Sequence, residues 1–477
     1  MATRMSSSSR RPQTSEAIAS QPRTLSGPVF AQPEPTADPT IFKIKHPSDS
    51  PAYHAIDELN KLHKIQPMPF PRPRGNKAEP QLSLVEVFGG SADAAKAVSA
   101  IQANKQIVFH STGDCGSTRG PKTQNEVTDK MIGDFNETEA KEIPQFALLL
   151  GDIVYSFGEK EYYYDQFYEP YRNYHAPVLA AAGNHDGMIS PLAHARSLEG
   201  YLRNFCYGPA KGFVVTQEAG GLSRTAQVQP GVFFTFDAPF VRILVFYSNT
   251  LEDPGVIANN TIGHAQIDFL RAALRRAKQE NYKGALLFAH HHPPYAFGGQ
   301  HSSSTEMRQQ MDAVCDEVGL WPHAVLAGHA HSYQRFTRHR KDGSEIPYLI
   351  CGNGGHNVQK LRPVDGNTIR VPQTMQSRSR DEDQVVFERY DDTDYGYMRI
   401  IATGDQLRIE YHPASDGVDA KTPDDSVTID LAQRRRTTFK PSALGITAAA
   451  GEIRSLHTRQ SRARQQRQAR AKARRKR

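Results

Sequence analysis

A run of five apolar residues at 146–150 is followed at once by Gly151 and Asp152. Such a short apolar run is typical of a strand that is buried on both faces in the middle of a parallel sheet. In open α/β sheets, ligands bind beyond the carboxyl ends of the strands, which is where Asp152 stands. Tyr155 follows three residues later. Alone, the stretch fits equally well a strand that ends in a Gly-Asp turn with a packing tyrosine.

The same arrangement recurs along the chain: a predicted strand, a loop that carries Asp, Asn or His, and then a predicted helix. Strands separated by helices predict βαβ units and a largely parallel sheet. Later apolar segments follow one another without helices, which predicts antiparallel pairs in a second sheet packed on the first. The predicted strands before a polar loop lie at 106–110, 146–150, 177–182, 285–289 and 324–327, and the later ones at 348–351, 397–402, 407–411 and 427–429.

Three regions differ in composition. Residues 1–104 are rich in Ser, Pro, Gln and Thr and include a polyproline-like piece at 67–74, so we expect a mostly irregular N-terminal arm with a short helix at 94–105. The regular pattern predicts one domain at 105–432. The remainder, 433–477, is predicted to be a basic, disordered tail.

The net charge of +7 is unevenly spread. From Arg434 onward the chain has 15 Lys and Arg against one acid, a charge of +14, so the rest of the chain carries −7. Such a tail predicts contact with nucleic acid, polyphosphate or another polyanion. A solvated tail without a partner is the competing interpretation, and no aromatic residues interleave the arginines to stack on bases.

Other features bear on the compartment. No apolar run approaches the length of a membrane helix, and the basic residues near Met1 are not followed by the apolar region of a signal peptide. The four cysteines are scattered, which suits a reducing environment. We therefore expect a cytoplasmic protein without a transmembrane segment, although the chain alone leaves export open. Its oligomeric state is not predicted.

Five loops that follow predicted strands carry potential metal ligands. A single aspartate there is usually a cap, and a single histidine is usually structural, but five such loops in one domain favour a shared site. Carboxylate, amide, phenol and imidazole groups together suit first-row transition ions. The candidates are Asp114, Asp152, Tyr155, Asn184, His185, His291, His329 and His331.

The order of these motifs resembles the calcineurin-like metallophosphoesterase superfamily. Over about residues 106–335 the chain reads Gly-Asp, Gly-Asp-x-x-Tyr, Gly-Asn-His-Asp, His-x-Pro and Gly-His-x-His. Many members begin with Asp-x-His, but here Asp114 is followed by Cys115 and Gly116. Tyr155 stands three residues after the second Asp, as in the purple acid phosphatase branch. The resemblance implies an α/β fold, a four-layer α/β/β/α sandwich of two mixed sheets flanked by helices.

The resemblance also implies a ligand set for two metal ions. Asp152 would bridge Fe3+ and a divalent ion, Zn2+, Mn2+ or Fe2+. Of three consecutive histidines, His291 fits His-x-Pro because Pro293 lies two residues on, which leaves His290 and His292 as structural or supporting residues. The Fe3+ would be completed by Asp114, Tyr155 and His331, and the divalent ion by Asn184, His291 and His329.

Two further histidines are implied to contact the substrate. His185 follows the ligand Asn184, and His301 lies ten residues beyond His291, where plant-type members carry a substrate-binding histidine. The histidine that precedes it in that pattern is replaced here by Gln300. For His301, a loop residue without a role is the competing interpretation.

The expected reaction is hydrolysis of phosphate monoesters by in-line attack of a metal-bound hydroxide. A phosphodiesterase or pyrophosphatase on the same metal core is the nearest alternative. A non-catalytic polyanion-binding protein on an inactive scaffold is a third, and the presence of all seven ligand positions counts against it. No Gly-x-x-x-x-Gly-Lys loop is present, and the segment 352–355 is interpreted as a turn.

Overall fold

The computed structural model describes residues 23–25, 27–31, 78–189, 196–206, 213–220, 222, 224–225, 229–251, 253–260, 262–299, 301–363, 366, 368–375 and 383–441. The predicted polyproline piece at 67–74 and the basic tail beyond residue 441 lie outside them.

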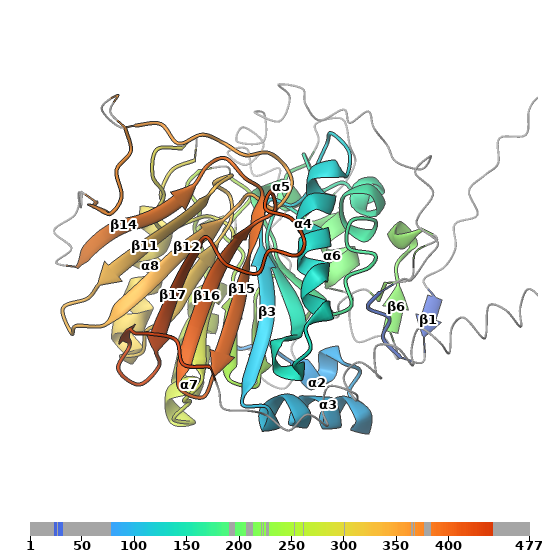
Figure 1. Cartoon of the computed structure of the whole chain (residues 1–477), viewed down its shortest axis with the longest axis horizontal. Coiled ribbons are helices and arrows are strands. Elements are labelled where there is room, and N and C mark those ends of the chain that lie inside the picture. Colours follow the sequence, from blue (N-terminus) through green and yellow to red (C-terminus); the bar gives the residue numbers. More distant parts are fainter. Residues whose placement is uncertain are drawn as a thin grey trace, which may run out of the picture.

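Two mixed sheets form the body of the molecule (Figure 1). The nine-stranded sheet contains, from edge to edge, β13 (Gln373–Thr374), β14 (Gln384–Asp391), β11 (Tyr333–His339), β12 (Glu345–Cys351), β10 (Ala324–Ala327), β9 (Ala285–Ala289), β8 (Val241–Val245), β7 (Phe234–Ala238) and β2 (Gln81–Ser83). The seven-stranded sheet contains β18 (Arg435–Arg436), β17 (Asp425–Asp430), β16 (Gln406–Pro413), β15 (Gly396–Thr403), β3 (Gln106–Thr112), β4 (Pro144–Leu150) and β5 (Val178–Ala181).

Each sheet has a parallel part, which contains the strands that lead into the loops with the predicted ligands. In the seven-stranded sheet β3, β4 and β5 run parallel, and in the nine-stranded sheet β8, β9, β10 and β12 do so. The remaining strands extend both sheets mostly in antiparallel fashion, and β1 (Arg23–Leu25) pairs with β6 (Phe213–Val215) apart from them. The predicted two-sheet α/β architecture is confirmed.

Apolar side chains fill the space between the sheets. Phe146 of β4 meets Phe236 of β7 edge to face, with ring centroids 4.9 Å apart, and stacks on Phe109 of β3 at 4.5 Å. All three rings are fully buried. Because burying such a side chain contributes roughly 1.5–3 kcal/mol, this shared core holds the two sheets in a fixed relation.

Helices cover the outer faces. α4 (Lys122–Gly133) packs Val127 and Met131 on the seven-stranded sheet, while α7 (Ala265–Gln279) and α8 (Thr305–Val318) cover the other. In α7, Phe269 packs edge to face on Phe246 next to β8, at 5.4 Å. The shorter helices are α2 (Leu84–Val87), α3 (Ala92–Ala103), α5 (Asn184–Gly187) and α6 (Glu199–Phe205).

The folded body extends beyond the predicted domain at both ends. β2 pairs with β7, and α2 and α3 pack buried residues such as Leu84 and Ile101 against the core between the sheets. The short helix predicted at 94–105 corresponds to α3, but the expectation of an irregular arm before it does not hold for β2 and α2. At the other end β18 pairs with β17, which carries the sheet past residue 432.

The two longest strands that escaped prediction, β11 and β14, have sequences interrupted by charged residues. β11 carries Arg335 and Arg338, whose guanidinium groups are buried against carboxylates rather than exposed. Arg335 Nε donates to Asp425 at 2.7 Å, and Arg338 Nη1 donates to Asp312 at 2.8 Å. Ion pairing of this kind lets a strand without apolar alternation lie inside a sheet. β14 differs, because its buried Val385 and Phe387 alternate with more exposed neighbours.

Glu79 ties the N-terminal strand region to α7. Its carboxylate is fully buried and accepts from Arg276 Nε at 2.8 Å and from the Thr235 hydroxyl at 2.8 Å. The Glu79→Ala variant should therefore lose about 2 kcal/mol of unfolding free energy, measured by urea denaturation, because Arg276 and Thr235 lose a charged partner. Asp93→Ala, at a carboxylate that is 74% exposed, is the control and should change it little. Equal losses would contradict the prediction.

Candidate metal centre

The predicted ligands stand at the carboxyl ends of five parallel strands drawn from both sheets. β3, β4 and β5 of the seven-stranded sheet lead into the loops of three groups, and β9 and β10 of the nine-stranded sheet lead into the other two. All the side chains meet where the two sheets end side by side, and all seven are buried: Asp114, Asp152, Tyr155, Asn184, His291, His329 and His331.

The strand ends share a backbone geometry. Asp114, Asp152 and His329 adopt left-handed conformations, with φ values of 55°, 54° and 69°. Each follows a glycine, so the chain turns sharply as it leaves its strand. Because a left-handed residue other than glycine costs roughly 1–2 kcal/mol, the surrounding packing must hold these turns in place.

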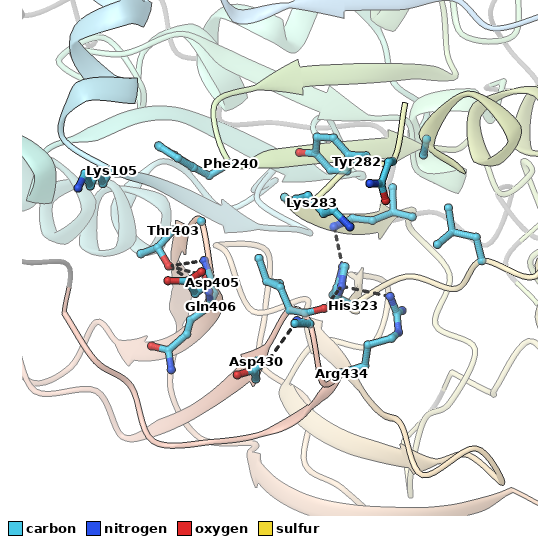
Figure 2. Close-up of a pocket in the computed structure, with 18 of the residues that line it drawn as sticks. Lys105, Phe240, Tyr282, Lys283, His323, Thr403, Asp405, Gln406, Asp430 and Arg434 are labelled. Atoms are coloured by element: carbon cyan, nitrogen blue, oxygen red, sulfur yellow. Dashed lines mark hydrogen bonds between the residues drawn. The ribbon is translucent and has the colours of Figure 1, made fainter. Parts of the chain in front are cut away.

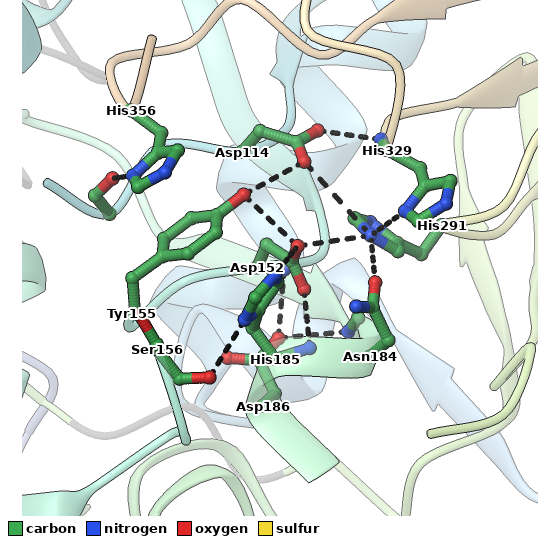
Figure 3. A network of polar contacts seen from close by, with 12 residues as sticks. Asp114, Asp152, Tyr155, Ser156, Asn184, His185, Asp186, His291, His329 and His356 are labelled. Carbon is green, nitrogen blue, oxygen red and sulfur yellow. Dashed lines mark hydrogen bonds and ion pairs between the residues drawn. The ribbon is translucent and has the colours of Figure 1, made fainter. Parts of the chain in front are cut away.

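Asp152 lies at the centre of the cluster (Figure 3). Its Oδ2 accepts from the Tyr155 hydroxyl at 3.0 Å and lies 3.2 Å from His291 Nε2. Its Oδ1 accepts from the backbone N–H of His185 at 2.9 Å. The carboxylate therefore touches both halves of the cluster, as a bridging ligand must.

One half of the cluster contains the phenol. The Tyr155 hydroxyl lies 3.0 Å from Asp114 Oδ1 and 3.3 Å from His331 Nε2, and those two atoms are themselves 3.3 Å apart. His331 Nδ1 is bonded to the side-chain oxygen of Asn357, which makes it the N–H nitrogen and leaves the Nε2 lone pair facing the phenol and the carboxylate.

The other half is centred on His291. Its Nδ1 donates to the Leu150 carbonyl at 2.7 Å, so in the neutral ring Nε2 carries a lone pair. That lone pair points at Asn184 Oδ1 (2.9 Å) and Asp152 Oδ2 (3.2 Å), and His329 Nδ1 also lies 3.2 Å away. Acceptors that face one another repel unless a positive charge lies between them.

The close approach of these groups also shifts their pKa values. Burial lowers the pKa of His291, but the carboxylates of Asp152 and Asp114 outweigh it and raise that pKa to about 9. Burial raises the pKa of Asp152, yet His291 and His185 hold it below its usual range. Burial and the two carboxylates raise the pKa of Tyr155 well above 10, so its phenol keeps its proton until a cation displaces it.

The residues fit a metal centre. Asp152, His291 and His329 offer ligand atoms that all lie within 4.8 Å of one another. Neutral imidazole, carboxylate, amide oxygen and phenol form the mixed nitrogen and oxygen set that first-row transition ions prefer. Burial and His292 lower the pKa of His329 well below 6.5, so this ligand is neutral and ready to bind.

Asp186 organises the loops beneath the ligands. Its carboxylate accepts from the backbone N–H groups of Asp152 (2.9 Å), Ile153 (3.0 Å) and Gly183 (2.8 Å). Burial and the nearby Asp152 raise the pKa of Asp186 to about 7. The sequence interpretation included Asp186 in a motif but gave it no role, because only the structure shows that four N–H groups, that of Val154 included, converge on it.

His356 and Asn357 were missed altogether. The His356 ring stacks on Tyr155 with centroids 3.6 Å apart, and its Nδ1 lies 3.1 Å from the Gly116 carbonyl. Both residues follow the glycine-rich turn after β12, where no spacing pattern pointed to the site. The one available signal was a polar pair directly after that turn.

The predicted substrate histidines flank the cluster on two sides. His185 Nδ1 donates to the Ser156 carbonyl at 2.7 Å, and its Nε2 lies 3.9 Å from Asp152 Oδ2. The His301 ring lies 4.1 Å from that of His329 and 5.4 Å from that of His331. Gln300, where a histidine was expected from the plant-type pattern, lies outside the described residues.

A cavity lies at the opposite end of the sandwich. It has a volume of about 1240 Å³ and is lined by residues that precede the parallel strands, among them Lys105, Lys283 and His323 (Figure 2). His323 accepts from the Leu286 N–H at 2.9 Å and lies beside Arg434. No cluster of metal ligands converges on it within the described residues, so the strand-end cluster is the candidate site.

Two mixed sheets with helical outer layers and a strand-end cluster of carboxylate, imidazole, amide and phenol groups define a metallohydrolase-like domain. Residues 109–333 match the model of the calcineurin-like phosphoesterase family, which supports a phosphoric ester hydrolase domain over this part of the chain. A search of curated proteins finds no match. Within the part of the chain that the structure covers, no helix has the length and apolar character needed to cross a membrane.

Solved structures give more distant likenesses. A purple acid phosphatase, PPD1, from yellow lupin (Lupinus luteus) seeds is 17% identical, with 69% of this chain and 54% of that chain covered and a TM-score of 0.45. GAP50, the anchor in the inner membrane complex of Plasmodium, is 13% identical, with 74% and 94% covered and a TM-score of 0.43. PhoD is 13% identical, with 75% and 78% covered and a TM-score of 0.40. At these scores the likenesses carry no argument about activity.

Gly151 provides a test of the packing beneath the cluster. It has a φ of 94°, and an added Cβ would lie 2.5 Å from His291 Nδ1 and 2.8 Å from the Gly183 Cα. Gly151→Ala should abolish binding of metal to the His291 half and lower the unfolding free energy by more than about 1 kcal/mol, measured by metal analysis and urea denaturation. Gly404→Ala is the matched control, because its Cβ meets nothing within 4 Å. Full metal content in Gly151→Ala would refute the prediction.

Proposed function

We propose that this protein is a binuclear metal-dependent phosphatase that hydrolyses phosphate monoesters, in the manner of the purple acid phosphatases. The observation that carries the proposal is the lone pair of His291 Nε2, which faces two oxygen acceptors at 2.9 and 3.2 Å around a shared Asp152. A buried arrangement of this kind needs a proton or a cation between the acceptors, and phosphoesterase chemistry supplies the reason for two metal ions.

The two halves of the cluster differ in charge, which supports different ions. Asp114 and Tyr155 bring a carboxylate and a phenol to one half, and a phenolate is a hard anionic donor that suits Fe3+. The half with Asn184, His291 and His329 adds only neutral ligands to the shared Asp152, which suits Zn2+, Mn2+ or Fe2+. When bound, the two ions would lower the pKa of a water molecule and offset the charge of the phosphoryl group.

The chain's own residues would orient the ester. His185, held by the Ser156 carbonyl through Nδ1, presents Nε2 beside the shared carboxylate, where it can hold a phosphoryl oxygen. In its protonated form, the imidazole of either His185 or His301 can give a proton to the leaving oxygen. Because the ligands are buried, few water molecules compete for the same positions.

Two parts of the proposal rest on the sequence alone. Contact of the tail from residue 433 with polyanions is supported by its charge, and a cytoplasmic location by four scattered cysteines, which suit a reducing environment. Neither affects the chemistry of the strand-end cluster.

Asp152→Asn tests the bridging role. Removal of one negative charge between the two halves should lower kcat on p-nitrophenyl phosphate by at least about 1000-fold and reduce the metal content, because the shared anionic ligand is lost. Asp268→Asn, at an exposed α7 carboxylate, is the control and should keep full activity. A wild-type protein without bound metal and without activity would disprove the enzyme assignment, while activity only on diesters or pyrophosphate would change its substrate class.

Tyr155→Phe tests the identity of the first ion. If the phenolate binds Fe3+, the purified wild type should show a charge-transfer absorption in the visible range, and Tyr155→Phe should lose it with little change in overall fold, since the ring is retained. A colourless wild type with two divalent ions would remove the iron assignment and leave the phosphoesterase core standing.

A further inference from the structure

One buried nitrogen of the metal centre, Nε2 of His329, lacks the hydrogen-bond partner that a metal-binding histidine normally has. His329 directs Nδ1 toward His291 at 3.2 Å, so its Nε2 points away from the ligand cluster. The His329 side chain is 2% exposed, and Nε2 makes no hydrogen bond. A histidine that binds a metal through one nitrogen normally donates its other N–H to a carboxylate, carbonyl or water, which fixes its tautomer.

The nearest carboxylate to that nitrogen belongs to Asp253. Its Oδ1 lies 3.7 Å from His329 Nε2, and the ligand atoms of Asp253, His301 and His329 lie within 4.8 Å of one another. The Asp253 side chain is one-third exposed, and a hydrogen bond of about 3.0 Å requires its oxygen to move roughly 0.7 Å toward Nε2. Asp253 lies in the connection between β8 and α7, outside every motif that pointed to the site.

The loop that carries Asp253 is itself anchored beside the ligands. His292, the residue after the ligand His291, contacts Ser248 Oγ through Nδ1 at 2.8 Å and donates from Nε2 to the Leu251 carbonyl at 2.7 Å. An added Cβ at Gly255 would collide with the His292 ring, which shows how closely the far side of the loop packs there. Asp253 is thus held near His329 by contacts made on both sides of it in sequence.

Asp253 also holds the segment with the second substrate histidine. Its Oδ1 accepts from the Ser302 N–H at 3.1 Å and from the Ser302 hydroxyl at 3.0 Å. Ser302 directly follows His301, whose ring lies 4.1 Å from that of His329. The same carboxylate oxygen therefore faces a metal ligand on one side and the His301 loop on the other.

We propose that Asp253 is a positioning residue of the second metal site: it accepts the Nε2–H of His329, orients that ligand's Nδ1 toward the divalent ion, and fixes the His301 loop beside it. This inference rests on the proposed binuclear function. It assigns Asp253 no contact with the reacting atoms.

The test measures the two Zn2+ dissociation constants of the full-length protein by competition with a chromogenic chelator. Asp253→Ala should weaken one of them by about 10- to 100-fold, the range known for such supporting carboxylates, and leave the other within twofold. Asp253→Asn keeps an oxygen acceptor for Ser302 but lacks the charge. Its loss of Zn2+ affinity should therefore lie between that of the wild type, which is none, and that of Asp253→Ala. Asp268→Ala on α7 is the control.

Three outcomes separate the proposals. A selective loss at one Zn2+ site, with thermal unfolding of the metal-free variant unchanged, supports the role of Asp253. Two unchanged dissociation constants in Asp253→Ala, in a wild type that binds two ions and hydrolyses p-nitrophenyl phosphate, overturn the inference alone. A wild type that binds no Zn2+ and has no activity overturns the proposed function and this inference with it.

Discussion

The lone pair on Nε2 of His291 is the constraint on which the rest of the site depends. Because Nδ1 is fixed by the Leu150 carbonyl at the end of β4, the imidazole cannot turn to relieve the repulsion from Asn184 and Asp152. The ring is therefore held against two oxygen acceptors from a neighbouring sheet. Only a proton or a cation between these atoms removes the repulsion. The raised pKa of His291 means that the ring takes up a proton there when no metal is bound.

The His291 ring stays in this position because apolar side chains between the two sheets hold the sheets together. The contact of Phe146 with Phe236 between β4 and β7 helps to set the distance between the sheets. The distance between their strand ends depends on it. Left-handed turns at Asp114, Asp152 and His329 then aim the side chains into one volume. The strain at these turns is offset by the apolar packing around them.

The sequence was most informative where a strand and its ligand lie next to each other in the chain. The segment that ends in Asp152 was predictable because an apolar run and a Gly-Asp turn are local features. β11 was not, since Arg335 and Arg338 lie in the sheet only through carboxylates far away in sequence. His356 reaches the site through the fold alone, as does Asp186 through backbone N–H groups, and no spacing rule describes either contact.

Ligands from both sheets give a bound ion a second effect. Three ligand-bearing loops follow strands of one sheet and two follow strands of the other, so an ion held among them joins the sheets like a cross-link. The free energy of unfolding then depends on the metal concentration outside the molecule, by about 1.4 kcal/mol for each tenfold excess over the dissociation constant. For this fold, the supply of metal and the stability of the folded chain are therefore coupled.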